Sequence, residues 1–234
     1  EGSTGVVHPV LNEAVTQFQA ATYKEMLPST GPVRAQIIGS STTGVEQQAQ
    51  RVQTYMNYML MHEMEEFEPE FDQMLYFLGL AGSAFKKVYY DEILGRPVSK
   101  FVPVEDIVVN YTATDLQSAE RVTHVISISG NELLKSQVNG VYSESMMTEN
   151  GEGRGQNEVK DAYDDIQGIS SGYSDKEFSL FESHCYLDVE EYPDTDEKGE
   201  ETGIKLPYVV TICKETSEVL SVRRNYNPQD PKKS

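Results

Sequence analysis

The sequence predicts an α+β fold in which N-terminal amphipathic helices pack on a mainly antiparallel β region. Apolar residues recur every three or four positions up to about residue 84, and beyond that point they alternate with polar ones. We therefore expect a helical region over residues 1–84, a β region with short helices over 85–226, and a linker-like tail over 227–234. A chain of 234 residues with 14 Tyr and 8 Phe is long enough for one large domain or two small ones.

The first helix is expected to begin at His8 and Pro9, because proline suits the first helical turn, where its missing N–H is not needed. The apolar residues at helical spacing are Val7, Leu11, Ala14, Phe18 and Ala21. The segment PSTGP at 28–32 ends this helix. A short strand is expected over 33–38, followed by a turn-rich segment at 39–44.

A second helix is expected over residues 45–66. Its apolar positions follow the spacing of a helix packed along one seam, and they are Val45, Ala49, Val52, Met56 and Met59. Pro69 should break or kink this helix. A third helix then continues the same period from Phe67 and ends near residues 79–82, where two glycines stand.

Beyond Ala84 the pattern predicts strands. Residues 85–91 and 98–102 form a hairpin about 93–97, and further strands are expected at 107–110 and 121–127. Ser129 and Glu132 have the spacing of a capping box, so a helix should run over 132–138 and stop at Asn139 and Gly140. Residues 147–158 read as a polar surface loop, and 159–166 as a short helix.

The last strands are expected at 178–192 and 205–214, with an edge strand at 220–226. If the first two pair about a turn centred on Gly199, Cys185 and Cys213 lie opposite each other. Two cysteines are too few for a secreted disulfide framework. They are then either two reduced core residues or a redox or metal pair.

The net charge of −19 argues against a DNA-gripping protein, because such binding needs clustered Lys and Arg. The basic clusters are only the pairs at 86–87, 223–224 and 232–233. The longest apolar runs are too short to span a bilayer, and the first eight residues do not resemble a signal peptide. We expect a soluble, intracellular protein without membrane contact.

The densest group of carboxylates runs from Glu63 to Asp72, directly after His62. The zinc-protease pattern HExxH is absent, because Glu66 stands where the second histidine would be. The expected role is a solvated face around a helix kink, and the alternative is a divalent-metal or catalytic site.

No other pattern in the chain predicts catalysis. His8, His62, His124 and His184 are scattered, and His184 and Cys185 are adjacent in a predicted strand, so they point to opposite faces. The glycines at 151–155 lack the context of a phosphate-binding loop. We therefore predict no catalytic residue, no cofactor, no metal ligand and no enzyme activity. Lys86 and Lys87 are expected to lie on a half-exposed strand, or else to meet an acidic partner.

Four segments carry a resemblance to a known family: GVVHPVLNEAVTQFQA at 5–20, RVQTYMNYML at 51–60, DQMLYFLGLAGSAFKKVYYD at 72–91, and KFVPVEDIVVNYTATDLQSAERVTHVISISGNELLK at 100–135. In order and spacing they resemble the N-terminal, wing portion of the portal proteins (head-to-tail connectors) of short-tailed double-stranded DNA bacteriophages. The resemblance covers most of residues 5–135 and is looser beyond them. None of the matching words is catalytic, so no functional residue carries over.

The resemblance implies a structural subunit of a closed ring of about twelve copies at one capsid vertex. Such rings support head assembly, bind capsid and scaffolding proteins, dock the packaging terminase, let DNA pass without sequence-specific binding, and attach the tail adaptor. It implies a location in the virion, and in the host cytoplasm during assembly. The family's proteins are longer, so we expect an N-terminal piece in which residues 45–78 supply part of a subunit contact. The alternatives are a non-portal structural adaptor or scaffold module and a metal-dependent hydrolase using Glu63–Asp72.

Overall fold

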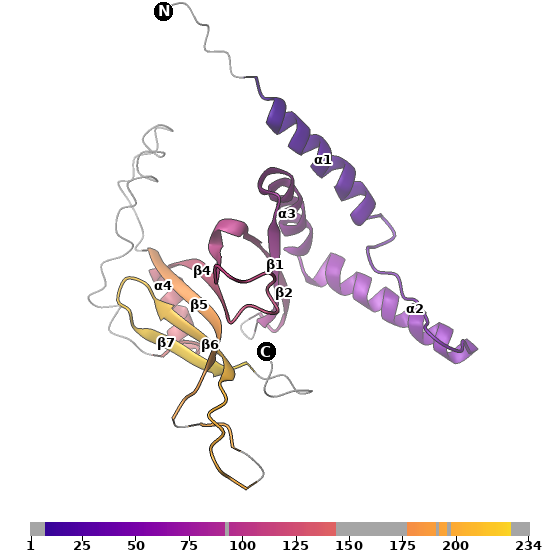
Figure 1. Cartoon of the computed structure of the whole chain (residues 1–234). Coiled ribbons are helices and arrows are strands. Elements are labelled where there is room, and N and C mark those ends of the chain that lie inside the picture. The colour runs from indigo at the N-terminus through magenta and orange to yellow at the C-terminus, as the bar shows by residue number, and fades with distance from the viewer. Residues whose placement is uncertain (1–7, 92–93, 144–176, 191, 196–197, 226–234) are drawn as a thin grey trace, which may run out of the picture. The chain divides into compact units, whose positions relative to one another are not determined.

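The computed structural model describes residues 8–91, 94–143, 177–190, 192–195 and 198–225. The chain has an α+β fold of helices and antiparallel sheets and divides into two compact units, residues 1–105 and 106–234. Figure 1 shows the helices and strands of both units. The expected loop at 147–158, the expected helix at 159–166 and the expected tail at 227–234 lie outside the described residues.

Three helices and a hairpin form the first unit. They are α1 (Val10–Met26), α2 (Thr43–Tyr58), α3 (Phe67–Ala81), β1 (Ala84–Asp91) and β2 (Arg96–Pro103). Helices α1 and α3 pack against each other, with Val15 and Leu75 buried. They approach closely because Gly79 has no side chain: a Cβ there would lie 3.1 Å from a ring carbon of Phe18.

The expected strand at residues 33–38 does not form. These residues, called the strap below, run along α2 and bond to amide side chains of that helix. Asn57 accepts from the Val33 N–H at 2.9 Å and donates to the Val33 carbonyl at 3.1 Å, and Gln53 accepts from the Ala35 N–H at 3.0 Å. The amides therefore supply the backbone partners that a neighbouring strand would have provided.

The second helix ends earlier than its apolar pattern indicates. Helix α2 stops at Tyr58 and continues as a π-helical turn over Met59–Glu63, and residues 64–66 interrupt the helix. Pro69 follows this interruption and lies in the first turn of α3, where its missing N–H removes no intrahelical bond. The break therefore precedes the proline, in contrast to the expectation. Helix α3 ends as predicted, with Gly82 as a left-handed cap.

The predicted hairpin forms, with Lys86 opposite Phe101 and Val88 opposite Ser99. It packs on α3, where the rings of Phe77 and Phe101 lie 5.2 Å apart. The boundary between the units consequently falls after residue 105, and not after residue 84 where the periodicity changes.

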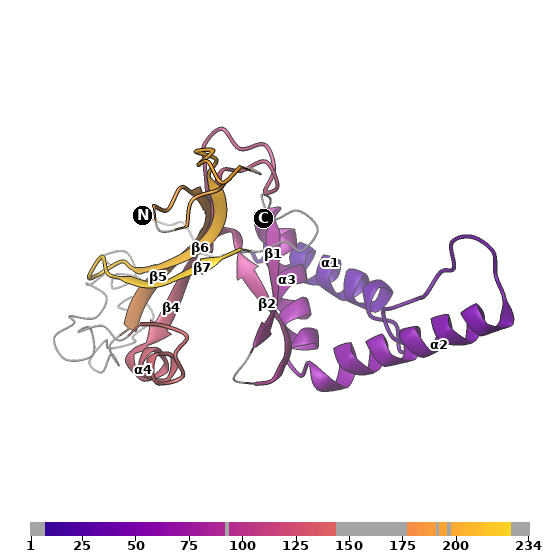
Figure 2. The same cartoon turned by 90° about the horizontal axis from the view of Figure 1, so that it is seen from below.

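The second unit is a five-stranded antiparallel sheet with one helix. Its strand order is β3 (Ile107–Val109), β4 (Arg121–Ser129), β5 (Glu177–Leu187), β6 (Leu206–Cys213) and β7 (Val219–Arg224). Helix α4 (Gly130–Val138) starts as predicted, with the Ser129 hydroxyl accepting from the Glu132 N–H at 3.3 Å. Figures 1 and 2 both show α4 beside β4. Its Leu133 is fully buried in a cluster with Phe178, Leu180, Cys213 and Leu220.

The predicted pairing of the two cysteines is wrong. Cys185 lies opposite Tyr208, and Cys213 lies opposite Leu180. Leu180 and Cys185 are separated by an odd number of positions, so the two thiols point to opposite faces of the sheet. The register differs because the last strand pair, Leu187 with Leu206, is centred ahead of Gly199. No disulfide or paired-thiol site can form between them within this fold.

Candidate functional site

The acidic segment is the strongest candidate site, and the structure shows where its carboxylates go. Its six members are Glu63, Glu65, Glu66, Glu68, Glu70 and Asp72. They are spread over the π-helical turn, the interruption and the first turns of α3. Glu66, Glu68 and Glu70 each contact a different element or residue of the first unit. The segment is therefore divided among separate contacts.

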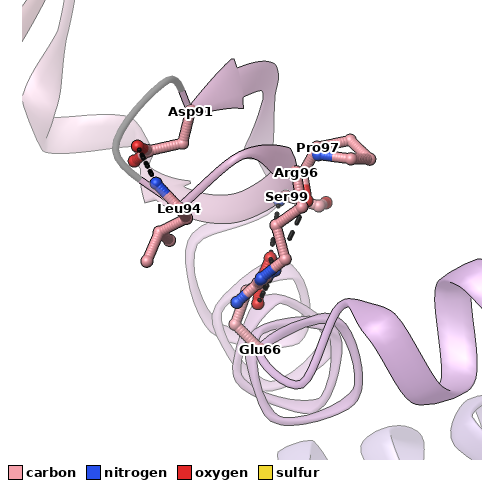
Figure 3. A network of polar contacts seen from close by, with 6 residues as sticks. All are labelled: Glu66, Asp91, Leu94, Arg96, Pro97 and Ser99. Atoms are coloured by element: carbon pink, nitrogen blue, oxygen red, sulfur yellow. Dashed lines mark hydrogen bonds and ion pairs between the residues drawn. The ribbon is translucent and has the colours of Figure 1, made fainter.

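Glu66 connects the start of α3 to the start of β2 (Figure 3). Arg96 Nη1 donates to both carboxylate oxygens, at 3.0 and 2.7 Å, and the Ser99 N–H donates to Oε1 at 3.2 Å. Burial alone would raise the pKa of Glu66, but bonds from its own N–H, from Arg96 and from the Ser99 N–H outweigh burial and lower the pKa. The carboxylate is held in its ionised form.

Glu70 repeats this contact one helical turn later. Its Oε2 accepts a hydrogen bond from the Phe101 N–H at 2.6 Å. Ser99 and Phe101 are two positions apart, so both N–H groups point to the edge of β2 that does not face β1. Two helix carboxylates therefore take the place of a third strand. We call Glu66, Glu70, Arg96 and the backbone N–H groups of Ser99 and Phe101 the carboxylate clamp.

Lys86 lies beside this clamp with its amine buried. The Nζ atom is 4.0 Å from the ring centroid of Phe67 and 5.0 Å from that of Phe71, and within the described part of the chain it has no hydrogen-bond partner. Burial lowers the pKa of Lys86, while the carboxylates of Glu70 and Glu66 act in the opposite direction. The expected half-exposed position of this lysine is thus wrong for its amine, which is held by aromatic faces and nearby negative charge.

The remaining acidic residues at α3 connect it to α1. The Tyr23 hydroxyl donates to Glu68, and Gln19 donates to the Asp72 carbonyl at 3.1 Å. The hydrogen bond to Glu68, followed by burial and the charges of Glu68 and Asp72, raises the pKa of Tyr23 to about 12. These contacts stabilise the packing of α1 on α3.

The structure brings no metal site together. Among the residues that it describes, no group of three or more His, Cys, Asp or Glu side chains is placed to hold a metal ion. His62 packs near Tyr58, with ring centroids 5.5 Å apart, and His184 approaches Glu182 at 3.3 Å. Burial raises the pKa of the Cys185 thiol in spite of nearby Arg121, which keeps it in the less reactive protonated form.

The sequence reasoning missed the partners of the acidic residues. Arg96 lies in a predicted hairpin turn, and Ser99 and Phe101 contribute only backbone N–H groups, which any residue type carries. The one available signal was the pair of lysines at 86–87 in an otherwise apolar junction. No described helix combines the length and apolar character that a membrane-spanning segment needs. A comparison with models of protein families and with curated proteins gave no match.

Proposed function

We propose that this chain is the N-terminal part of a portal subunit, which acts by forming a ring with copies of itself at a phage capsid vertex. The resemblance of residues 5–135 motivates the proposal, and the exposed apolar face of α2 supports it. No residue of α2 is buried, and Val52 and Met56 of its apolar seam are 47% and 37% exposed. Tyr55 and Tyr58 widen the exposed surface. Aromatic residues and methionine are enriched in contacts between subunits.

The use of the acidic segment also agrees with a structural role. Glu66 and Glu70 bond to Arg96 and to backbone N–H groups, so their oxygens are engaged within the fold. A hydrolase using these residues would need them free to bind a metal or a water molecule. We therefore favour the structural role over the hydrolase.

The native mass of the chain tests the proposal, measured alone and within the longest reading frame that contains it. We expect a closed ring of about twelve copies in at least one sample. Val52→Glu should reduce the ring fraction, whereas Gln48→Glu, which places the same charge at another exposed position of α2, should not. A discrete dimer in both samples would reject the portal assignment in favour of an adaptor. Rings unaffected by Val52→Glu would exclude α2 from the contact.

A further inference from the structure

The two edges of the β1–β2 hairpin differ. On β2 the outward N–H groups of Ser99 and Phe101 are bonded to the carboxylate clamp. In an antiparallel pair, directly opposed residues are either both bonded to each other or both turned outward. Val88 is opposite Ser99 and Lys86 is opposite Phe101, so their backbone groups point away from β2, as do those of Tyr90.

The outer edge of β1 has no such covering. Among the described residues, the backbone groups of Lys86, Val88 and Tyr90 form no hydrogen bond beyond the hairpin. The side chains of Val88 and Tyr90 lie on one face and are 68% and 63% exposed. An open edge with exposed apolar side chains is a template for another strand. A two-stranded sheet is also only marginally stable by itself, so a third strand would stabilise it.

The opposite face of the hairpin is positively charged. Lys87 stands directly opposite Lys100 on this face. Like charges in this arrangement repel each other. The pair is unusual in a chain whose net charge is −19. The neighbour that this face favours therefore carries negative charge.

We propose that the outer edge of β1 binds an extended strand of another protein, in which apolar residues alternate with acidic ones. The backbone of this strand would bond to the outward groups of Lys86, Val88 and Tyr90. Because side chains alternate between faces, its apolar residues would pack beside Val88 and Tyr90 and its acidic residues beside Lys87. A second copy of β1 fits less well, because it would bring further lysines to the hairpin. The inference does not depend on the portal assignment.

Hydrogen exchange on the whole ¹⁵N-labelled chain tests this site, with a blocked peptide of alternating Val and Glu as the probe. We expect the peptide to slow exchange at the amides of Lys86, Val88 and Tyr90, while those of Lys87 and Tyr89, already paired with β2, change little. The control peptide carries Lys in place of Glu and should bind more weakly. Absence of binding, protection at another edge, or equal binding of both peptides would overturn the proposal. Self-association of the free chain that protects this edge would assign it to a second copy instead.

Two variants separate the charge from the backbone contribution. Lys87→Glu should weaken binding of the acidic peptide about five-fold, the scale of an exposed ion pair. The control Lys135→Glu makes the same change on α4 and should have no effect. Val88→Pro removes an outward N–H that the β1–β2 ladder does not use, so binding should be lost while Tyr89 stays protected. Should this proline unfold the hairpin, unchanged binding of Lys87→Glu would by itself refute the proposal.

Discussion

Replacing Glu66 with alanine removes two contacts of the carboxylate clamp at once. The ion pair with Arg96 joins side chains that are 19% and 27% exposed, so its loss should cost no more than about 1 kcal/mol. The Ser99 N–H belongs to a residue only 2% exposed, and a buried donor left without an acceptor costs about 1–3 kcal/mol. We therefore expect Glu66→Ala to lower the free energy of unfolding of the first unit by about 3 kcal/mol.

The measurement is urea unfolding followed by hydrogen exchange of peptides from β2 and α3, since the chain has two compact units that can unfold separately. Glu66→Gln keeps an acceptor for Ser99 and loses only the charge, so it should cost about 1 kcal/mol. Glu65→Ala, at an exposed neighbouring position, is the control and should cost less than about 0.5 kcal/mol. Equal stability of Glu66→Ala and Glu65→Ala would refute the role assigned to the clamp.

The pH dependence of this effect has a definite sign. The pKa of Glu66 is lower in the folded chain than its usual 4.5. Its ionised form therefore stabilises the fold fully above pH 4.5, and this contribution is lost as the pH falls through the lowered pKa. The difference between the wild type and Glu66→Gln should thus be constant near neutral pH and shrink in acid. A difference that grows on acidification would contradict the assignment.

Three further predictions concern single positions. Lys86→Met fills similar space without a buried charge, so stability at neutral pH should stay unchanged or rise by about 1 kcal/mol. Any such gain should shrink as the pH approaches the usual lysine value of 10.5, whereas a large loss in urea unfolding would show that the amine itself stabilises the site. Cys185 and Cys213 should remain two titratable thiols after mild oxidation of the folded chain, and a mass loss of two hydrogens in the monomer would contradict the strand register. Gly31→Ala places a Cβ 2.4 Å from the amide that holds the strap, so it should destabilise the strap more than Gly39→Ala, where only the positive φ is strained; equal exchange rates in both variants would refute this contact.

Local signals predicted most of the fold. Both long amphipathic segments are helices, the change of period at residue 84 marks the start of β1, and Ser129 caps α4. These features depend on neighbouring residues, so the sequence displays them directly. The end of α2 was missed because the apolar spacing continues through the π-helical turn, and nothing in it distinguishes residues 59–63 from a further helical turn.

Contacts between distant residues could not be predicted in the same way. The register of β5 and β6 depends on where the long connection leaves each strand, and a symmetric turn at Gly199 was only one of several possible arrangements. The strap was mistaken for a strand because its backbone partners are the side chains of Asn57 and Gln53, about twenty positions away. Tertiary partners, and not local propensity, decide such segments.

The acidic segment shows why composition alone leaves its role open. A row of glutamates has the same appearance in sequence whether it binds a metal, faces solvent or accepts backbone hydrogen bonds. Here Glu66 and Glu70 are one turn apart on one face of a helix, and the N–H groups of Ser99 and Phe101 repeat along one edge of a strand. The match between these two spacings makes the helix a substitute for a strand at β2. It also leaves β1 as the hairpin's open edge, so the residues that first suggested catalysis instead determine where a partner strand can bind.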